Sequence, residues 1–261
     1  MDAVQSPPVA VGHVKPMSIT DAMVNIFASP GEVYENVRQT PITHKNWVVP
    51  TVLLVVIGAI LTYLILSNLV IADQYKQQQK VQMEKQFEKQ IQQGKMTQEQ
   101  ADQARAQAEQ FTSPTMMIIW GLGAASIGPF FILFLMSLIY WLLGKTVMKA
   151  TSPYFKVTEV VGLTFYISIL ETIVTTILII GLGNAFATPS LALLLPNFSP
   201  DNHLHMLASA GNIFTFWILA VVSIGLAKIF QKDFPKVLFL VCAIWVIWTL
   251  IKVFGLSMLR G

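Results

Sequence analysis

The chain has 261 residues, of which 54% are hydrophobic and only 12% charged, and its formal net charge is +3. This composition excludes an ordinary soluble domain, and the small net charge gives no support for nucleic-acid binding. The apolar residues lie in blocks rather than in a period, which predicts membrane spans. A single cysteine, Cys242, excludes an intrachain disulfide. No secretory signal peptide is expected, because the first apolar run begins only at Trp47 and is long.

The segment before the first apolar run predicts a tail and two short helices. Residues 1–17 contain three prolines and few apolar anchors, which is typical of a flexible tail. Residues 18–46 predict two amphipathic helices, the first starting at Ser18. The second starts at Ser29-Pro-Gly-Glu32, where the serine can cap, the proline suits the first helical position and the glutamate can bond back. We expect these helices to lie in the membrane interface or to pack on the protein's own cytosolic face.

Five apolar runs have spanning or near-spanning length, since about 20 helical residues cross a bilayer. The last two are short and need a thin bilayer or flanking aromatic anchors. The sequence therefore predicts an all-α membrane protein, a bundle of five transmembrane helices over residues 47–254 with a tail at 255–261. The expected spans are about 47–71, 116–143, 158–182, 213–230 and 237–254.

The second span contains features of close packing and bending. Gly121 and Ala125, and likewise Ala124 and Gly128, are small residues four positions apart, which allows a neighbouring helix to approach closely. Gly128 and Pro129 lie near its middle, and the proline predicts a kink because it removes a backbone hydrogen bond.

Residues 73–111 form a charged insertion between the first two spans. One helix is expected from about residue 74 to residue 93, ended by Gly94. A second helix should begin at Thr97-Gln-Glu-Gln100, which is a capping-box pattern, and run to about residue 109. The insertion is thus predicted to be an extramembrane helical hairpin. It is interpreted as a solvated hairpin with a small internal seam, or alternatively as a protein-contact surface.

The basic residues of the loops predict the orientation. The second-to-third and fourth-to-fifth loops hold three lysines each, whereas residues 183–212 hold no Lys or Arg. The positive-inside rule then places the N-terminus in the cytoplasm and the C-terminus outside. The charged hairpin falls outside, where its six basic residues are balanced by six acidic ones. Within residues 183–212, Ser190–Pro196 is too short to cross and is expected to be surface-lying or re-entrant.

No constellation of residues points to an enzyme. The chain contains no P-loop, nucleophile elbow or His-Glu-x-x-His pattern, so we predict no catalytic residues and no cofactor. His203 and His205, with Asp201 nearby, could bind a metal in a loop. Because no third clustered ligand accompanies them, an incidental pair is favoured and no metal site is predicted. Gly181-x-Gly183 is interpreted as a helix end.

A polar stripe follows the third span, residues 158–182, which has a carboxylate at its centre. Its members are four, three and four positions apart and so share one helix face: Thr164, Ser168, Glu171 and Thr175. A carboxylate at bilayer depth costs roughly 2.5–3.5 kcal/mol, so Glu171 should face protein or water. The stripe is either the lining of a substrate or proton path, or an interhelical cluster in which Glu171 is protonated or bonded to a neighbour such as Tyr140 or Tyr63.

Several segments in one order and spacing resemble the Yip1 domain family, in its bacterial form, over about residues 18–254. Two features depart from the family pattern, namely the charged insertion 73–111 and Glu171. The segments that carry the resemblance are Ile26-Phe-Ala-Ser-Pro30, Val33-Tyr34, Pro41, Trp47-Val-Val-Pro50, Phe155-Lys-Val157, Val160-Val-Gly162, Tyr166-Ile-Ser168, Ser190–Pro196, Ile213-Phe-Thr-Phe-Trp217 and Gly225.

The resemblance implies a five-span, non-enzymatic protein of the bacterial inner membrane with a cytosolic N-terminus. Eukaryotic relatives are associated with Rab-type GTPases and vesicle traffic, but the long cytosolic region of those relatives has no counterpart here, so GTPase binding does not carry over. We expect a role in membrane organisation, with the lipid bilayer, other membrane proteins or a second copy of the chain as partners, and no nucleic acid. The alternative is a small transporter or lipid-handling protein that uses the polar face of the third span.

Overall fold

The computed structural model describes residues 14–111, 113–196 and 198–255, and the predicted tails lie largely outside them. The described part of the chain is helical, with loops and one isolated bridge between Ser190 and Asn212. Five of its helices are long and apolar enough to cross a membrane, which confirms the predicted all-α, five-span class. They are α3 (Lys45–Ser67), α6 (Pro114–Thr146), α7 (Tyr154–Leu182), α9 (Ile213–Phe230) and α10 (Phe234–Leu250), which continues into a π-helical turn, η2 (Ile251–Gly255).

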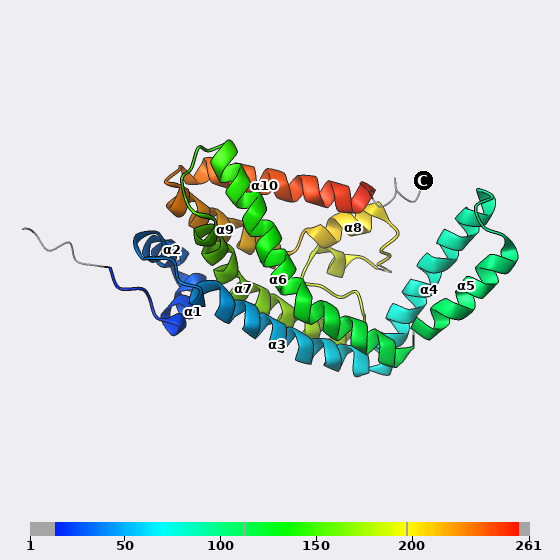
Figure 1. The fold of residues 1–261 in the computed structure, drawn as a ribbon. Helices are drawn as coiled ribbons and strands as arrows, with labels where there is room; N and C mark the ends of the chain where they lie inside the picture. Colours follow the sequence, from blue (N-terminus) through cyan, green and yellow to red (C-terminus); the bar gives the residue numbers. More distant parts are fainter. Residues whose placement is uncertain (1–13, 112, 197, 256–261) are drawn as a thin grey trace, which may run out of the picture.

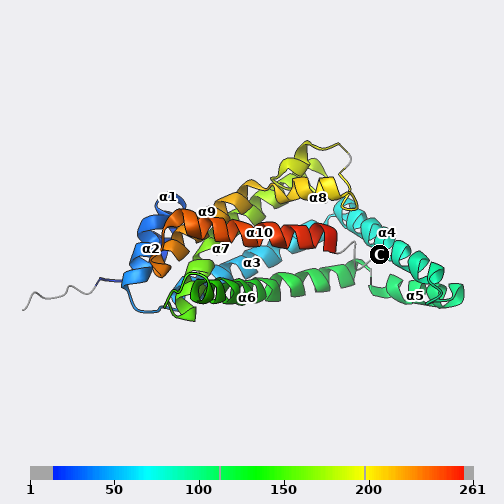
Figure 2. The same cartoon turned by 90° about the horizontal axis from the view of Figure 1, so that it is seen from above.

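The bundle is arranged around α7, which packs against α3, α6 and α9. Two short helices, α1 (Ile19–Ala28) and α2 (Pro30–Gln39), lie at one end of the bundle, as Figures 1 and 2 show. The hairpin of α4 (Leu69–Gln92) and α5 (Gln98–Phe111) projects from the opposite end. Between α7 and α9 lie a short 3₁₀ turn, η1 (Leu191–Leu194), and α8 (His203–Ala210). The two ends of the molecule are therefore built differently, one by a compact cap and the other by a projecting arm.

Glycines allow the helices around α7 to approach closely. A Cβ on Gly162 of α7 would lie 2.4 Å from the Cβ of Trp47 on α3. A Cβ on Gly225 of α9 would lie 2.5 Å from Cγ1 of Val160. Both distances are too short for real atoms, so these contacts between helices require glycine.

The helix α2 is part of the bundle's core. Its apolar side, Val33, Tyr34 and Val37, is fully buried, and α2 packs against α9 and α7. This packing agrees with the alternative that α2 packs on the protein itself, while the cytosolic location of this face stays a prediction. Val24 of α1 is more than half exposed, and the membrane-interface position of α1 stays a prediction.

Several predicted helix ends are confirmed. The Ser18 hydroxyl accepts a hydrogen bond from the Asp21 N–H at the start of α1. The capping box of α5 is reciprocal, with Thr97 Oγ1 accepting from Gln100 N–H at 3.2 Å and Gln100 Oε1 accepting from Thr97 N–H at 2.9 Å. Gly94 has a positive φ of 67°, as expected for the residue that ends a helix.

Two local predictions are wrong. The helix α2 begins at Pro30 as predicted, with Ser29 as its N-cap residue, but the side chain of Ser29 makes no capping bond to α2. The first span ends at Ser67 instead of residue 71, because the next residue, Asn68, caps a new helix and accepts from Val70 N–H and Ile71 N–H. The last apolar residues of the predicted span thus belong to α4. By contrast, α6 runs as one helix through Pro129, and the predicted kink there stays a prediction.

Candidate functional site

The predicted polar stripe lies on α7, and Glu171 links it to another element. Thr164 is buried and its hydroxyl donates to the Val161 carbonyl of the same helix at 2.7 Å. Ser168 and Thr175 are half-buried. Glu171 Oε1 accepts a hydrogen bond of 2.6 Å from Nδ2 of Asn212. Asn212, rather than the suggested tyrosines, is therefore the partner of this carboxylate.

Asn212 joins three parts of the chain at this point. It is the N-cap of α9, and its Oδ1 accepts from Phe214 N–H at 2.9 Å while its Nδ2 donates to Glu171. The backbone on either side of Asn212 pairs with the chain around Ser190, since Leu191 N–H donates to the Gly211 carbonyl and Ile213 N–H donates to the Pro189 carbonyl. These hydrogen bonds hold the connection between α7 and α9 together and attach it to α7 at Glu171.

The lengths of α7 and α9 place this junction well inside the bundle. The 18 residues of α9 extend about 27 Å, and Glu171 lies about 25 Å from the start of the 29-residue α7. At the other end of the pair, the Ser152 hydroxyl donates to the Ile229 carbonyl at 2.5 Å. The helix α9 thus lies alongside the part of the chain from Ser152 to Glu171. The last turns of α7 extend beyond the start of α9.

The first turns of α7 contain a second polar cluster, in which every proton of one ammonium group has an acceptor. Lys156 Nζ donates to the Val37 carbonyl at 2.5 Å and to the Pro41 carbonyl at 3.3 Å, and it lies 3.1 Å from Oε1 of Glu159. Glu159 has no exposed surface and Lys156 is 8% exposed. The pair therefore has the partners that a buried ion pair requires.

Glu159 in turn binds the segment that enters α3. Its Oε2 accepts from Asn46 Nδ2 at 2.7 Å, and its Oε1 accepts from Thr43 N–H at 3.3 Å. Nearby, the buried Tyr34 hydroxyl of α2 donates to the Val160 carbonyl at 3.1 Å. Burial raises the pKa of the Tyr34 phenol, so it stays a neutral donor. This clamp, formed by Lys156, Glu159 and Asn46, attaches the α2–α3 connection to α7.

The clamp was not among the sites predicted from the sequence, although the sequence contains a signal for it. Lys156 and Glu159 are three residues apart and lie on one helix face at the edge of an apolar run. Lys156 lies within Phe155-Lys-Val157 and Glu159 directly precedes Val160-Val-Gly162, two segments that carry the family resemblance, but only the carboxylate at the centre of the span was predicted to be a site. A lysine and a glutamate three residues apart at the start of a span form a pattern that could have predicted the pair of Lys156 with Glu159.

The hairpin of α4 and α5 is attached to the bundle at its base. Tyr75 donates through its hydroxyl to the Ala185 carbonyl at 2.9 Å, and Gln74 Oε1 accepts from Ala185 N–H at 2.8 Å. About two turns further along α4, Gln82 bonds to Asp201, and about three turns further Lys85 Nζ contacts Asp201 Oδ2 at 2.6 Å. One face of α4 thus lies along the loop between α7 and α9. This attachment, which we call the latch, holds the arm at a defined position.

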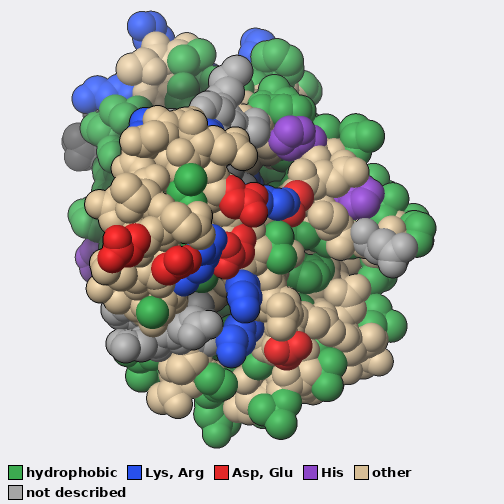
Figure 3. Space-filling model, turned by 90° about the vertical axis from the view of Figure 1, so that its right-hand side faces the viewer, with side chains coloured by type: hydrophobic (Ala, Val, Ile, Leu, Met, Phe, Trp, Pro, Cys, Tyr) green, Lys and Arg blue, Asp and Glu red, His purple; other side chains and the backbone are tan. Residues whose placement is uncertain are grey.

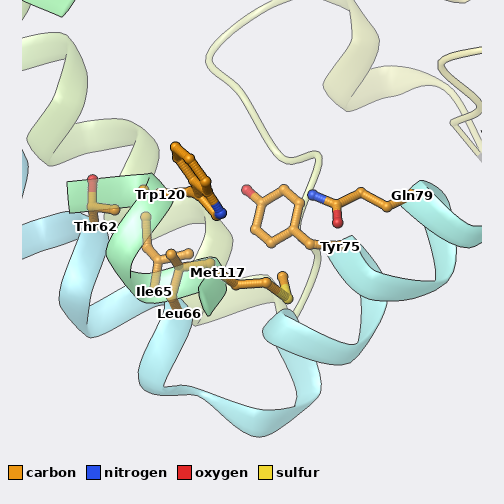
Figure 4. A pocket seen from close by; sticks show the side chains of 8 residues that line it. Thr62, Ile65, Leu66, Tyr75, Gln79, Met117 and Trp120 are labelled. Carbon is orange, nitrogen blue, oxygen red and sulfur yellow. The ribbon is translucent and has the colours of Figure 1, made fainter. Parts of the chain in front are cut away.

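A cleft of about 590 Å³ lies where α4 leaves the bundle. Figure 4 shows Trp120 of α6 and Tyr75 of α4 facing each other, with Leu66 of α3 below them. Burial raises the pKa of the Tyr75 phenol. Apolar side chains line most of the cleft, which gives it no constellation for catalysis.

The two histidines that were predicted to lie in a loop belong to the first turn of α8 and have other contacts. His205 Nδ1 accepts from Ser199 N–H at 3.0 Å, and the His203 ring packs on Phe254 with the centroids 5.2 Å apart. Among the described residues, no group of three or more His, Cys, Asp or Glu side chains could hold a metal ion.

Comparison with known proteins gives one match. The family model described as the Yip1 domain matches residues 24–256. No curated protein matches the chain. No solved structure matches it either.

Proposed function

The chain belongs to the Yip1 domain family, and from this premise we propose that it is a non-enzymatic protein of the bacterial cytoplasmic membrane that organises the membrane by contacting other membrane proteins. The family is a non-enzymatic, multi-pass membrane family. In this proposal the clamp and the junction of Glu171 with Asn212 hold the bundle together, and the projecting arm contacts the partner.

The observation that carries this proposal is the arm itself. The 24 residues of α4 extend about 36 Å, and the latch fixes the base of this helix. Arg105 of α5 binds Glu84 of α4 at 2.8 Å, and its guanidinium lies 5.8 Å from the ring centre of Phe87. Seen end-on in Figure 3, acidic and basic side chains alternate over this end of the molecule. An arm held so firmly, with charges of both signs at its surface, suits a specific protein contact.

The orientation that we propose places the N-terminus in the cytoplasm and the arm outside. Support comes from the lysines near the ends of α6 and α9, among them Lys149 and Lys232, which lie at the same end of the bundle as α1 and α2. The latched loop between α7 and α9, which contains no lysine or arginine, lies at the other end.

The experiment is cross-linking and pull-down from native membranes with a shortened arm. Replacing residues 87–103 by a short turn keeps the latch and the pair of Glu84 with Arg105 but removes the tip. We expect the shortened protein to lose the partners that the full chain captures. Its elution profile in detergent checks that it is folded. Capture of the same partners would show that the tip is not the contact surface. Deletion of residues 73–111 serves as a second comparison.

A second candidate function is transport or lipid handling along the polar face of α7. It rests on Glu171, a half-buried carboxylate of a spanning helix that accepts from Asn212 at the start of α9. Flux into liposomes that contain the wild-type protein or the Glu171→Gln variant distinguishes the two functions. Flux that depends on Glu171 supports transport, whereas absent flux, or flux unchanged in the variant, removes it.

A further inference from the structure

A second cleft lies at the opposite end of the bundle from the arm, where α6 ends and α10 begins. Its volume is about 640 Å³. Val147 and Met148, which directly follow α6, form one wall, and Phe239 and Leu240 of α10 form the other. Lys232 and Lys236 also line it, and both are exposed. The cleft thus combines apolar walls with two ammonium groups.

The two kinds of lining are separated along α10. Lys236 lies in the first turn of the helix, and Phe239 and Leu240 follow three and four residues later on the same side, about 5 Å further along. Phe239 is 78% exposed and Val147 is 60% exposed, so these apolar side chains face outward from the bundle. Because α10 is a membrane-spanning helix, its first turn lies near the membrane surface and the following turns lie among the acyl chains.

The charge around the lysines is positive. Lys236 Nζ contacts Asp233 Oδ2 at 2.7 Å, in a pair whose two side chains are 76% and 71% exposed. The hydrogen bond from Lys236, and to a smaller extent the charge of Lys232, lowers the pKa of the Asp233 carboxyl. Two lysines, Lys232 and Lys236, thus line the cleft beside a single carboxylate, which leaves one positive charge in excess.

We propose that this cleft binds one anionic glycerophospholipid, with its phosphate between Lys232 and Lys236 and an acyl chain along Phe239 and Val147. The lysines complement a phosphate at the membrane surface, as in other basic pockets between spans. The apolar walls complement the hydrocarbon, which a free phosphate ion lacks. A zwitterionic lipid carries no net charge for the excess ammonium group to attract.

The test is native mass spectrometry of the full chain in detergent, titrated with phosphatidylglycerol or phosphatidylcholine. We expect the first phosphatidylglycerol to bind at least tenfold more tightly than phosphatidylcholine. The double variant Lys232→Gln/Lys236→Gln should bind phosphatidylglycerol roughly 30-fold more weakly. The control Lys76→Gln/Lys80→Gln removes two exposed lysines of the arm at the same spacing and should leave the affinity unchanged. Asp233→Asn should strengthen binding, because it removes the competing carboxylate.

Three results would overturn the proposal. The first is an unchanged lipid preference in Lys232→Gln/Lys236→Gln. The second is displacement of phosphatidylglycerol by an equal concentration of glycerol phosphate, which would show that the apolar walls contribute nothing. The third is a lipid-free dimer that the same double variant abolishes, which would show that a second copy of the chain covers the cleft.

Discussion

Asn46 and Glu159 are 113 residues apart in the chain, and Asn46 Nδ2 donates a 2.7 Å hydrogen bond to Glu159 Oε2 where α3 begins. The bond fixes the start of α3 on the first turns of α7. Because Glu159 also holds Lys156, and Lys156 holds the carbonyls of Val37 and Pro41, one carboxylate orders the whole connection between α2 and α3. Stability should therefore depend strongly on this residue.

Glu159→Gln should destabilise the protein by about 3–5 kcal/mol, because it leaves the Lys156 ammonium buried without its counter-ion. Thermal unfolding in detergent, followed by circular dichroism, measures the loss. Asp102→Asn is the control, since it removes the acidic partner of an exposed pair with Arg105, and it should not change the midpoint measurably. Equal midpoints for Glu159→Gln and the wild type would show that the clamp does not stabilise the bundle.

Gly225→Ala should destabilise the contact between α9, α7 and α2 by about 1–3 kcal/mol. The added Cβ would lie 2.5 Å from Val160 Cγ1 and 2.9 Å from the Tyr34 ring, both of which are buried. Gly123→Ala in α6 is the matched control, because a Cβ there meets no atom within 4 Å. That change should be neutral or raise the unfolding midpoint, since alanine favours the helix by about 1 kcal/mol. Identical effects of the two changes would contradict the close packing at Gly225.

Asp201→Lys should loosen the latch, because Lys85 would then face another ammonium group. Hydrogen exchange of the backbone should become faster in residues 74–85 and 183–201, while the exchange of α9 stays unchanged. The double variant Lys85→Asp/Asp201→Lys restores opposite charges and should slow the exchange again. A double variant that exchanges as fast as Asp201→Lys alone would argue against a direct pair.

Acid should remove a stabilising contribution at the end of the bundle that α1 and α2 cover. Hydrogen bonds from Arg38, and then from Gln39 and Lys228, lower the pKa of Glu35 to about 2. A lowered pKa means that the folded state favours the carboxylate, so the contribution is complete above about pH 5 and is lost as the pH falls toward 2. The difference in unfolding midpoint between the wild type and Glu35→Gln should thus shrink from pH 6 to pH 3. A difference that stays constant over this range would exclude the carboxylate as its source.

The sequence predicts the five spans because each is a long block of apolar residues, and this property does not depend on distant contacts. It also predicts the capping box of α5, whose partners are only three residues apart. The break at Asn68 was missed because local capping there interrupts a continuous apolar run. Such a competition between cap and span cannot be decided from hydrophobicity alone.

The candidate site was predictable only where its partners are close in the chain. The face that Glu171 shares with Thr164 follows from helical spacing. Its partner Asn212 lies 41 residues away, and the two backbone carbonyls that accept from Lys156 lie more than 100 residues away. Pairs of this kind are formed by the packing of whole helices, which a single sequence does not specify.

The central claim, that the arm is the surface that contacts partners, is tested most directly by photo-cross-linking in living cells. A photo-reactive residue is placed at exposed positions of the arm, such as Lys80 or Gln103, or at Ile247 on the exposed side of α10 as a membrane-facing control. We predict discrete protein adducts from the arm positions and none of those adducts from Ile247. Absence of protein adducts from the arm, or the same adducts from Ile247, would contradict the claim.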